Sequence, residues 1–186
     1  MNDRGLQKLS VFLIGMMGTG KTSVGRILAE RLCYRFFDTD VLIERVTGQS
    51  IPQIFADRGE AGFRGLESQV LSELSAYTQC AIATGGGIVT QPMNWSYLRH
   101  GLIVWLDAPV EVLVQRLESD TTRPLLKEGD RAEKLRSLLA TRISLYRQAD
   151  LQISAEGTPE AVCDRIIAQI PSVLKPPLTP QAIAEN

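Results

Sequence analysis

Residues 11–22 of this 186-residue chain read VFLIGMMGTGKT, a short apolar run followed by a glycine-rich turn. The last eight letters, Gly15 to Thr22, fit the pattern G-x-x-x-x-G-K-[ST], and a stretch of helical period with Val24 and Leu28 on one face comes next. A strand, this loop and a helix in that order turn backbone N–H groups and the positive end of a helix dipole towards phosphate oxygens. The stretch therefore predicts a binding site for ATP or GTP.

Two side chains of this loop have separate predicted tasks. Lys21 reaches the β- and γ-phosphates, and the hydroxyl of Thr22 is a ligand for Mg²⁺, which bridges phosphate oxygens. Mg²⁺ is thus the expected cofactor, with ATP as co-substrate. The predicted nucleotide contacts within the loop are Gly18, Thr19, Gly20, Lys21, Thr22 and Ser23.

Beyond the loop, short runs rich in β-branched and aromatic residues alternate with longer stretches of helical period. This pattern is typical of a parallel sheet with helices on both faces. We expect an α/β, P-loop NTPase-type three-layer fold, with a last helix capped by Thr158 and opened by Pro159, its pattern ending after Pro171. The strand candidates are residues 11–14, 34–37, 81–84, 102–106 and 151–154.

Composition limits the possible partners and the compartment. Lys and Arg number 20 against 21 Asp and Glu, so no overall positive field exists to hold a nucleic acid or an anionic membrane. Three widely spaced cysteines fit free thiols in a reducing compartment, and the apolar run at residues 11–14 is too short to span a membrane. We expect a cytoplasmic protein with small-molecule partners.

The length predicts one domain, residues 1–174. Residues 175–186 contain three prolines and little periodicity, which predicts a flexible C-terminal tail.

Charged residues after the second strand are candidates for binding a second substrate, which would accept a phosphoryl group from the nucleotide. Asp38 and Asp40 flank Thr39 beyond the predicted carboxyl end of that strand, where ligands of parallel sheets collect. One carboxylate can face hydrated metal and the other the acceptor hydroxyl. Aspartates in this position also cap helices, and the pattern alone leaves both roles open.

Two further segments suggest an anion site. The segment FRGLE, residues 63–67, is predicted to open the long third helical region, which places Arg64 and Glu67 three residues apart on neighbouring surface positions. Glu67 can therefore hold the guanidinium for bidentate capture of a carboxylate; an exposed pair of little energetic worth is the other possibility. Residues 85–87 are three consecutive glycines after a strand, which lets a ligand approach backbone N–H groups.

Two later arginines complete the set of candidates. Arg123 lies in the polar stretch 118–130, which has the character of a mobile flap able to bring a cation onto the transferring phosphate. Arg142 interrupts an apolar helical face near Leu138 and Ile143, so it points either into a cleft or, as a solvated helix arginine, into water.

In content, order and spacing these motifs resemble the shikimate kinase family. They are GMMGTGKT, the DTD at 38–40, FRGLE, the TGGG at 84–87, RPLL at 123–126 and the late Arg142, and the resemblance covers residues 10 to about 170. It implies a fold of the nucleoside-monophosphate-kinase type with five parallel strands. It also implies a substrate-binding section at about 41–70, a lid at about 118–130, and a monomer.

The same resemblance implies roles for individual residues. Asp38 would hold metal-bound water and Asp40 the hydroxyls of shikimate, while the catalytic set would be Lys21, Asp40 and Arg123. The implied carboxylate clamp is Arg64 with Arg142, and the implied backbone contacts are Gly86 and Gly87. Arg116 corresponds to an arginine that stacks on adenine, and Arg123 would close over the phosphates.

Other readings remain. A related small-metabolite kinase such as a gluconate kinase would share the loop and the lid but would not need paired arginines. A non-catalytic ATP-binding homologue would lack some of the reacting residues, all of which are present here. A guanine-specific switch needs an N-K-x-D segment, which the chain lacks.

Overall fold

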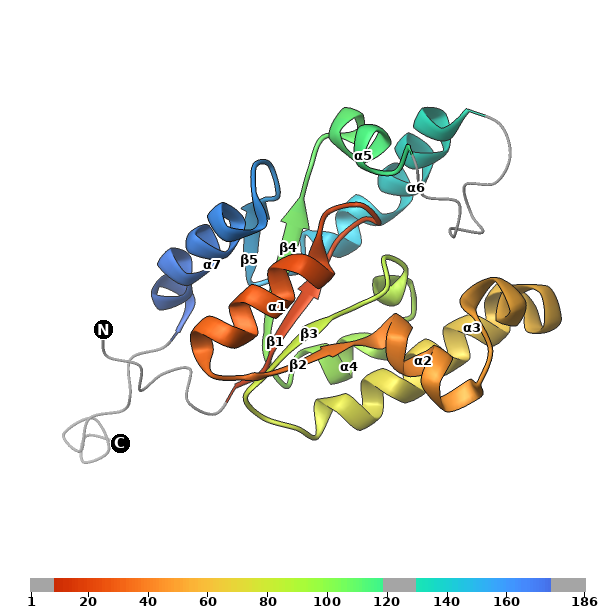
Figure 1. The fold of residues 1–186 in the computed structure, drawn as a ribbon, viewed down its shortest axis with the longest axis horizontal. Helices are drawn as coiled ribbons and strands as arrows, with labels where there is room; N and C mark the ends of the chain where they lie inside the picture. The colour runs from red at the N-terminus through yellow and green to blue at the C-terminus, as the bar shows by residue number, and fades with distance from the viewer. Residues whose placement is uncertain (1–8, 119–129, 175–186) are drawn as a thin grey trace.

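The computed structural model describes residues 9–118 and 130–174. Five strands form one parallel sheet in the order β2-β3-β1-β4-β5 (Figure 1). The predicted fold class is confirmed, and three of the predicted strands are shifted or extended by one residue. The strands are β1 (Val11–Ile14), β2 (Arg35–Asp38), β3 (Cys80–Ala83), β4 (Leu102–Asp107) and β5 (Leu151–Ser154).

Helices connect these strands. They are α1 (Lys21–Leu32), α2 (Thr39–Thr47), α3 (Ile51–Ser75), the 3₁₀ turn η1 (Ile88–Thr90), α4 (Asn94–Leu98), α5 (Val110–Arg116), α6 (Arg131–Tyr146) and α7 (Pro159–Val173). Thr158 caps α7 as expected, because its hydroxyl accepts a hydrogen bond from the Ala161 N–H at 3.3 Å. The helix continues through Pro171 to Val173, since a proline in the last turn removes only one hydrogen bond.

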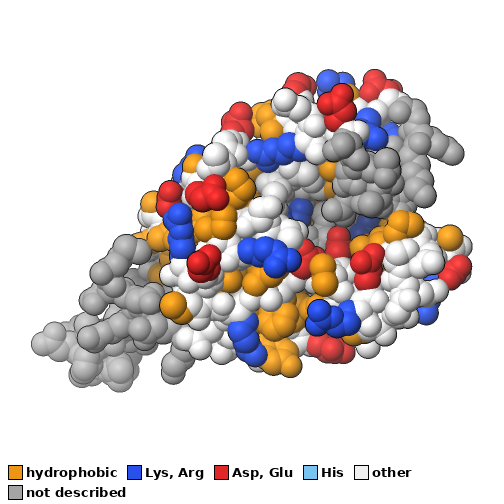
Figure 2. All heavy atoms as spheres, viewed as in Figure 1, with side chains coloured by type: hydrophobic (Ala, Val, Ile, Leu, Met, Phe, Trp, Pro, Cys, Tyr) orange, Lys and Arg blue, Asp and Glu red, His pale blue; other side chains and the backbone are white. Residues whose placement is uncertain are grey.

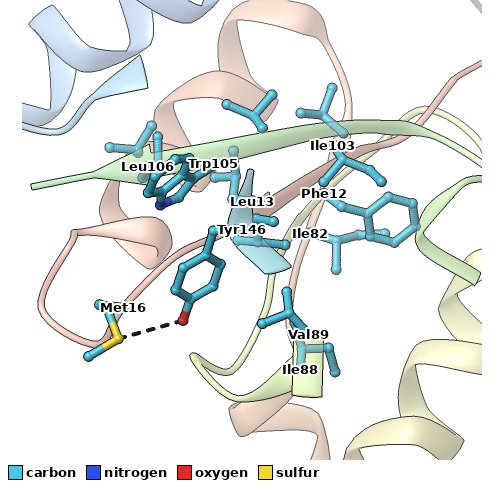
Figure 3. Close-up of a cluster of buried hydrophobic side chains, with 14 of the residues drawn as sticks. Phe12, Leu13, Met16, Ile82, Ile88, Val89, Ile103, Trp105, Leu106 and Tyr146 are labelled. Atoms are coloured by element: carbon cyan, nitrogen blue, oxygen red, sulfur yellow. Dashed lines mark hydrogen bonds between the residues drawn. The ribbon is translucent and has the colours of Figure 1, made fainter. Parts of the chain in front are cut away.

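The central strand β1 is buried on both sides, which explains its uninterrupted apolar sequence. On one side Leu13 lies against Gly25 of α1, and α1 runs beside α7. On the other side Phe12 and Ile82 pack in one cluster with Val89 of η1 and Tyr146 of α6 (Figure 3). The core therefore ties the sheet to helices on both faces, as the three-layer prediction requires.

Helix α3 differs most from expectation. FRGLE does not open it: α3 begins at Ile51, and FRGLE follows a break at Gly59. Gly59 has φ 65° and ψ −176°, a backbone conformation nearly restricted to glycine, and this break re-aims the second half of the helix. The start at Ile51 was missed because Gly59 and Gly62 predict a break in the helix before FRGLE.

All five strands point their carboxyl ends towards the same edge of the sheet. The glycine-rich loop follows β1, Asp38 ends β2, and the three glycines follow β3. Parallel order thus brings motifs that are far apart in the sequence to one edge, where ligands of such sheets bind. Within residues 9–118 and 130–174, no helix is long and apolar enough to cross a membrane.

Arg123, nearly all of the predicted lid at 118–130 and the tail at 175–186 lie outside the described residues.

Candidate active site

The glycine-rich loop has the backbone geometry of a phosphate cradle. Gly15, Gly18 and Gly20 all have positive φ angles, of 138°, 80° and 87°. A Cβ atom at Gly15 would also lie 2.4 Å from the carbonyl oxygen of Leu106 on β4. A side chain would therefore be excluded there both by backbone conformation and by space.

The side chain of Lys21, the first residue of α1, lies inside this loop and bonds to its backbone. Its ammonium group donates hydrogen bonds to the carbonyl oxygens of Gly15 at 2.9 Å and Met16 at 2.8 Å. The residue is only 8% exposed. A buried cation thus lies inside the loop that the sequence assigns to phosphate, beside the N-terminus of a helix.

Thr22 and Asp38 meet at the rim of the loop. The Thr22 hydroxyl donates a hydrogen bond to Oδ2 of Asp38 at 2.7 Å. The other oxygen, Oδ1, accepts from the backbone N–H groups of Asp40 at 3.0 Å and Val41 at 3.4 Å, so Asp38 also caps α2. Capping uses Oδ1 and leaves Oδ2 beside the Thr22 hydroxyl, so the capping role does not exclude the metal-facing role predicted from the sequence.

The oxygen atoms of Thr22 and Asp38 suit a hard cation such as Mg²⁺. Among the residues that the structure describes, no group of three or more His, Cys, Asp or Glu side chains could hold a metal ion. A Mg²⁺ ion at this rim would therefore take most of its ligands from phosphate and water, the usual arrangement when it accompanies a nucleotide.

Two clefts meet at this edge of the sheet. The phosphate cleft is lined by the glycine-rich loop, Lys21, Thr22 and Asp38, and the acceptor cleft by residues of α3, the glycines at 85–87 after β3, and Arg142 of α6. The two share Met17, Asp40, Gly85 and Gly86. Figure 2 shows the surface hollowed between the α2–α3 side and the α5–α6 side, with side chains of both charges in the hollow. A molecule in one cleft would lie directly beside a molecule in the other.

The acceptor cleft combines an apolar wall with buried charge. Its apolar side is made by Ile51, Phe55 and Phe63, with the two phenyl rings 4.8 Å apart between centroids. Arg64 and Arg142 lie among its lining residues, although they are only 6% and 4% exposed. This combination fits a small anion with an apolar ring or chain.

Arg64 is held by two glutamates of its own helix. Its Nη1 donates to Glu67 Oε2 at 2.5 Å, while Nε and Nη2 donate to Glu60 Oε1 at 3.2 Å and 2.8 Å. Glu67 is fully buried. The exposed, energetically minor pair considered from the sequence is therefore wrong, because burial strengthens the Arg64–Glu67 interaction and fixes the guanidinium.

Burial raises the pKa of Glu67 to about 7, against the opposing effect of Arg64 and with a smaller contribution from the nearby carboxylate of Asp40. Oε1 of Glu67 is buried without a hydrogen-bond partner. Taking this carboxylate out of water is thus only partly compensated by the arginine.

Two of the three glycines at 85–87 are required by these charged side chains, while Gly86 lies against the backbone of the phosphate loop. A Cβ atom at Gly85 would lie 2.1 Å from Oε1 of Glu67, and one at Gly87 would lie 2.2 Å from Nη1 of Arg64. The sequence suggested that a ligand needs this space. In the structure, Arg64 and Glu67 occupy it and pack directly against the glycine backbone.

Arg142 points into the acceptor cleft and is buried. Of the two placements predicted from the sequence, a cleft or water, the structure shows the first. Its Nη1 donates to the carbonyl oxygen of Gly86 at 3.2 Å, and the Tyr146 hydroxyl donates to the same oxygen at 2.5 Å. Tyr146 also reaches Sδ of Met16 at 3.6 Å (Figure 3). Helix α6 thereby ties the glycine segment to the phosphate loop.

Arg116 lies beside a third cleft, which continues from the phosphate cleft. Its guanidinium donates to the carbonyl oxygens of Ala155 at 2.9 Å and Gly18 at 3.4 Å. Gly20, Ser23 and Arg116 line both the phosphate cleft and this third cleft, which extends to Pro159. A nucleotide with its phosphates in the loop would find its base here.

Sequence reasoning missed Glu60, Tyr146 as a polar contact, and the apolar wall from Ile51 and Phe55. Glu60 was detectable, since it lies four residues before Arg64 on a helix. Nothing in the local pattern around Tyr146 shows that its hydroxyl reaches the carbonyl oxygen of Gly86.

The sequence matches the family model described as shikimate kinase over residues 17–171. It is 58% identical over 172 residues to a shikimate kinase of Microcystis aeruginosa, covering 91% of this chain and 90% of that relative. The fold is similar to that of shikimate kinase from Acinetobacter baumannii in complex with shikimate, with a TM-score of 0.88 and 42% identity over 91% of this chain and 97% of that one.

A gluconokinase from Sinorhizobium meliloti has a TM-score of 0.58 and 16% identity, covering 89% of this chain and 93% of that one. At this identity the likeness shows a common fold alone.

Proposed function

Because this chain belongs to the shikimate kinase family, we propose that the joined clefts at the carboxyl edge of its sheet carry out that family's reaction. The reaction transfers the γ-phosphoryl group of ATP to the 3-hydroxyl of shikimate, giving shikimate 3-phosphate and ADP. The observation that carries the site assignment is the meeting of the acceptor and phosphate clefts at Asp40 and Gly86. In-line transfer requires this adjacency of the two substrates.

On the donor side, the loop at Gly18, Thr19 and Gly20 would bind the phosphates through backbone N–H groups. Lys21 would exchange its hydrogen bonds to loop carbonyls for bonds to the β- and γ-phosphates, where negative charge grows during transfer. Its present contacts support this role, because they keep the cation inside the loop before the nucleotide arrives. Ser23 and Arg116 would contact the nucleotide beyond the phosphates.

When bound, Mg²⁺ would neutralise charge on the phosphate oxygens. Thr22 would hold it directly and Asp38 through water, which agrees with their 2.7 Å contact and with their oxygen donors.

On the acceptor side, Arg64 and Arg142 would bind the carboxylate of shikimate, with the ring against Phe55 and Phe63. Gly86 and Gly87 would add backbone contacts. Asp40 would accept a hydrogen bond from the 3-hydroxyl and take its proton as the oxygen bonds to phosphorus and the bond to the β-phosphate oxygen breaks. Its position in both clefts supports this assignment.

The remaining expectations belong to the same proposal. Arg123 would close over the phosphates as the lid cation, residues 41–70 would form the substrate-binding section, and residues 1–174 one domain. The protein would act as a cytoplasmic monomer. Arg123→Ala should then lower kcat by about 10²-fold or more while shikimate affinity stays within a few-fold.

A coupled assay of ADP release tests the proposal. Release should depend on shikimate and should not exceed the background rate with gluconate at the same concentration. ADP release that is equal with and without shikimate would contradict it, as would turnover of gluconate at a similar rate.

A further inference from the structure

Glu60 accepts hydrogen bonds from the guanidinium of Arg64 in the way that a substrate carboxylate would. One of its oxygens, Oε1, accepts from Nε and from Nη2, the two donors along one edge of the guanidinium. A bound carboxylate uses such an edge, because two parallel N–H groups match its geometry. Within the described structure, an internal carboxylate therefore lies where an incoming one has to compete.

The two glutamates on Arg64 differ in how easily they can leave. The Glu67 side chain is 1% exposed, whereas that of Glu60 is 52% exposed. Glu60 can move into water without being stranded as a buried charge, while Glu67 cannot. Arg64 would still be held from inside by Glu67 and by the ring of Phe63, whose centroid lies 5.5 Å from the guanidinium carbon. Glu60 is thus not needed to keep Arg64 in place.

The local charge balance favours its release. Arg64 and Arg142 bring two positive charges to the acceptor cleft, and Asp40 and Glu67 bring up to two negative ones. Glu60 does not line the cleft but adds a third negative charge through its ion pair with Arg64. The carboxylate of an incoming substrate adds repulsion unless one of these acidic side chains moves away or is protonated. Glu60 is the exposed member of the set, so its departure removes the most repulsion for the least desolvation.

The position of Glu60 next to Gly59 supports the same conclusion. The break at Gly59 separates the half of α3 that supplies Ile51 and Phe55 to the apolar wall from the half that supplies Arg64. Glu60 is the first residue after this break. It therefore lies at the joint between the two parts of the acceptor cleft that a ring with a carboxylate would contact.

We propose that Glu60 is an affinity-setting residue that competes with the substrate carboxylate for Arg64 and moves to solvent when shikimate binds. This rests on the proposed role of Arg64 as a carboxylate ligand. Glu60 thereby lowers the affinity for shikimate. In the empty cleft it compensates the positive charge of Arg64.

Calorimetric binding of shikimate to the full chain tests the inference. Glu60→Gln keeps the shape of the side chain and removes its charge, so it should bind shikimate about threefold to tenfold more tightly, the range expected for a half-exposed ion pair. Glu60→Asp keeps the charge but shortens the reach, and should also bind more tightly than wild type. Glu73→Gln, an exposed glutamate on the same helix, should bind like wild type.

A shikimate analogue with a neutral amide in place of the carboxylate separates competition from other effects. The Glu60→Gln variant should bind this amide analogue with the same affinity as wild type. Equal or weaker shikimate binding by Glu60→Gln, or an equal gain for acid and amide, would overturn the inference. Arg64→Ala distinguishes this from failure of the proposed site: if that variant binds shikimate like wild type, Arg64 is not the carboxylate ligand and the site assignment itself is wrong.

Discussion

The two clefts of this protein are built by different means. The phosphate cleft is built around one continuous segment, residues 15–22, whose conformation depends on glycines with positive φ and on a lysine bonded to its own loop. The acceptor cleft is assembled from α3, the segment after β3, and α6, and it depends on buried charge packed against glycine backbone. The donor side is thus fixed locally, while the acceptor side depends on tertiary packing.

If this contrast is correct, the largest effect should come from the local cation. Lys21→Ala removes a preorganised positive charge from the growing negative charge of the transition state, and should lower kcat by about 10²-fold to 10³-fold. Lys134→Ala on α6 is the matched control, because Lys134 does not line the phosphate cleft, and it should behave like wild type. Near wild-type turnover in a folded Lys21→Ala protein would refute the role.

The acceptor cleft should instead be sensitive to one methyl group. Gly87 has φ −99°, which alanine adopts, but its Cβ atom would lie 2.3 Å from the guanidinium carbon of Arg64. Gly87→Ala should therefore displace Arg64 and weaken shikimate binding by about tenfold to 100-fold, the size expected for losing a charged hydrogen-bonded contact. ATP binding should change little. Similar losses for both ligands would mean that the substitution disturbs the whole edge of the sheet.

The buried carboxyl group of Glu67 in the acceptor cleft should also make the stability of the protein depend on pH. The pKa of Glu67 is about 7 in the folded protein against 4.5 as its ordinary value, so the folded protein holds this proton more tightly than the unfolded chain. Its contribution to stability is fully present below pH 4.5 and is lost as pH rises through 7, a change on the order of 3 kcal/mol.

Urea unfolding from pH 4 to pH 8 measures this contribution by comparison with Glu67→Gln. The stability of wild type relative to the variant should fall across the window. A constant difference would show that the pKa of Glu67 is the same in the folded and the unfolded protein, and a rising one that it is lowered by folding.

The break in α3 gives a smaller effect. Gly59 needs an unusual backbone conformation, although no atom lies near its missing side chain, so Gly59→Ala should destabilise the protein by about 1 to 3 kcal/mol through strain. Gly65 on the same helix is exposed, helical and also surrounded by open space. Gly65→Ala should be stabilising by about 0.5 to 1 kcal/mol. Thermal unfolding of both variants tests the pair, and equal effects would argue against strain at Gly59.

The same contrast explains what could be predicted from the sequence. The glycine-rich loop and the fold class were predictable because one motif and one alternation of periods determine them. Arg64 with Glu67 was visible as a helix pair, but its burial was not, since that depends on contact with glycines about 20 residues away. The hydrogen bond from Tyr146 to Gly86 depends on packing that no local pattern records. The early start of α3 was predictable, because Ser50 and Gln53 form a capping box and Pro52 lies in the first turn.

Steady-state kinetics of Arg64→Lys tests most directly whether the acceptor cleft recognises a carboxylate through a fixed guanidinium. Lysine keeps the charge but cannot offer two parallel donors, so the KM for shikimate should rise about tenfold or more while the KM for ATP stays within twofold. Arg136→Lys, which changes an exposed arginine of α6, should leave both constants unchanged. Unchanged values of both KM constants in Arg64→Lys, or an equal rise in the two, would contradict the assignment of Arg64 and the separation of the two clefts.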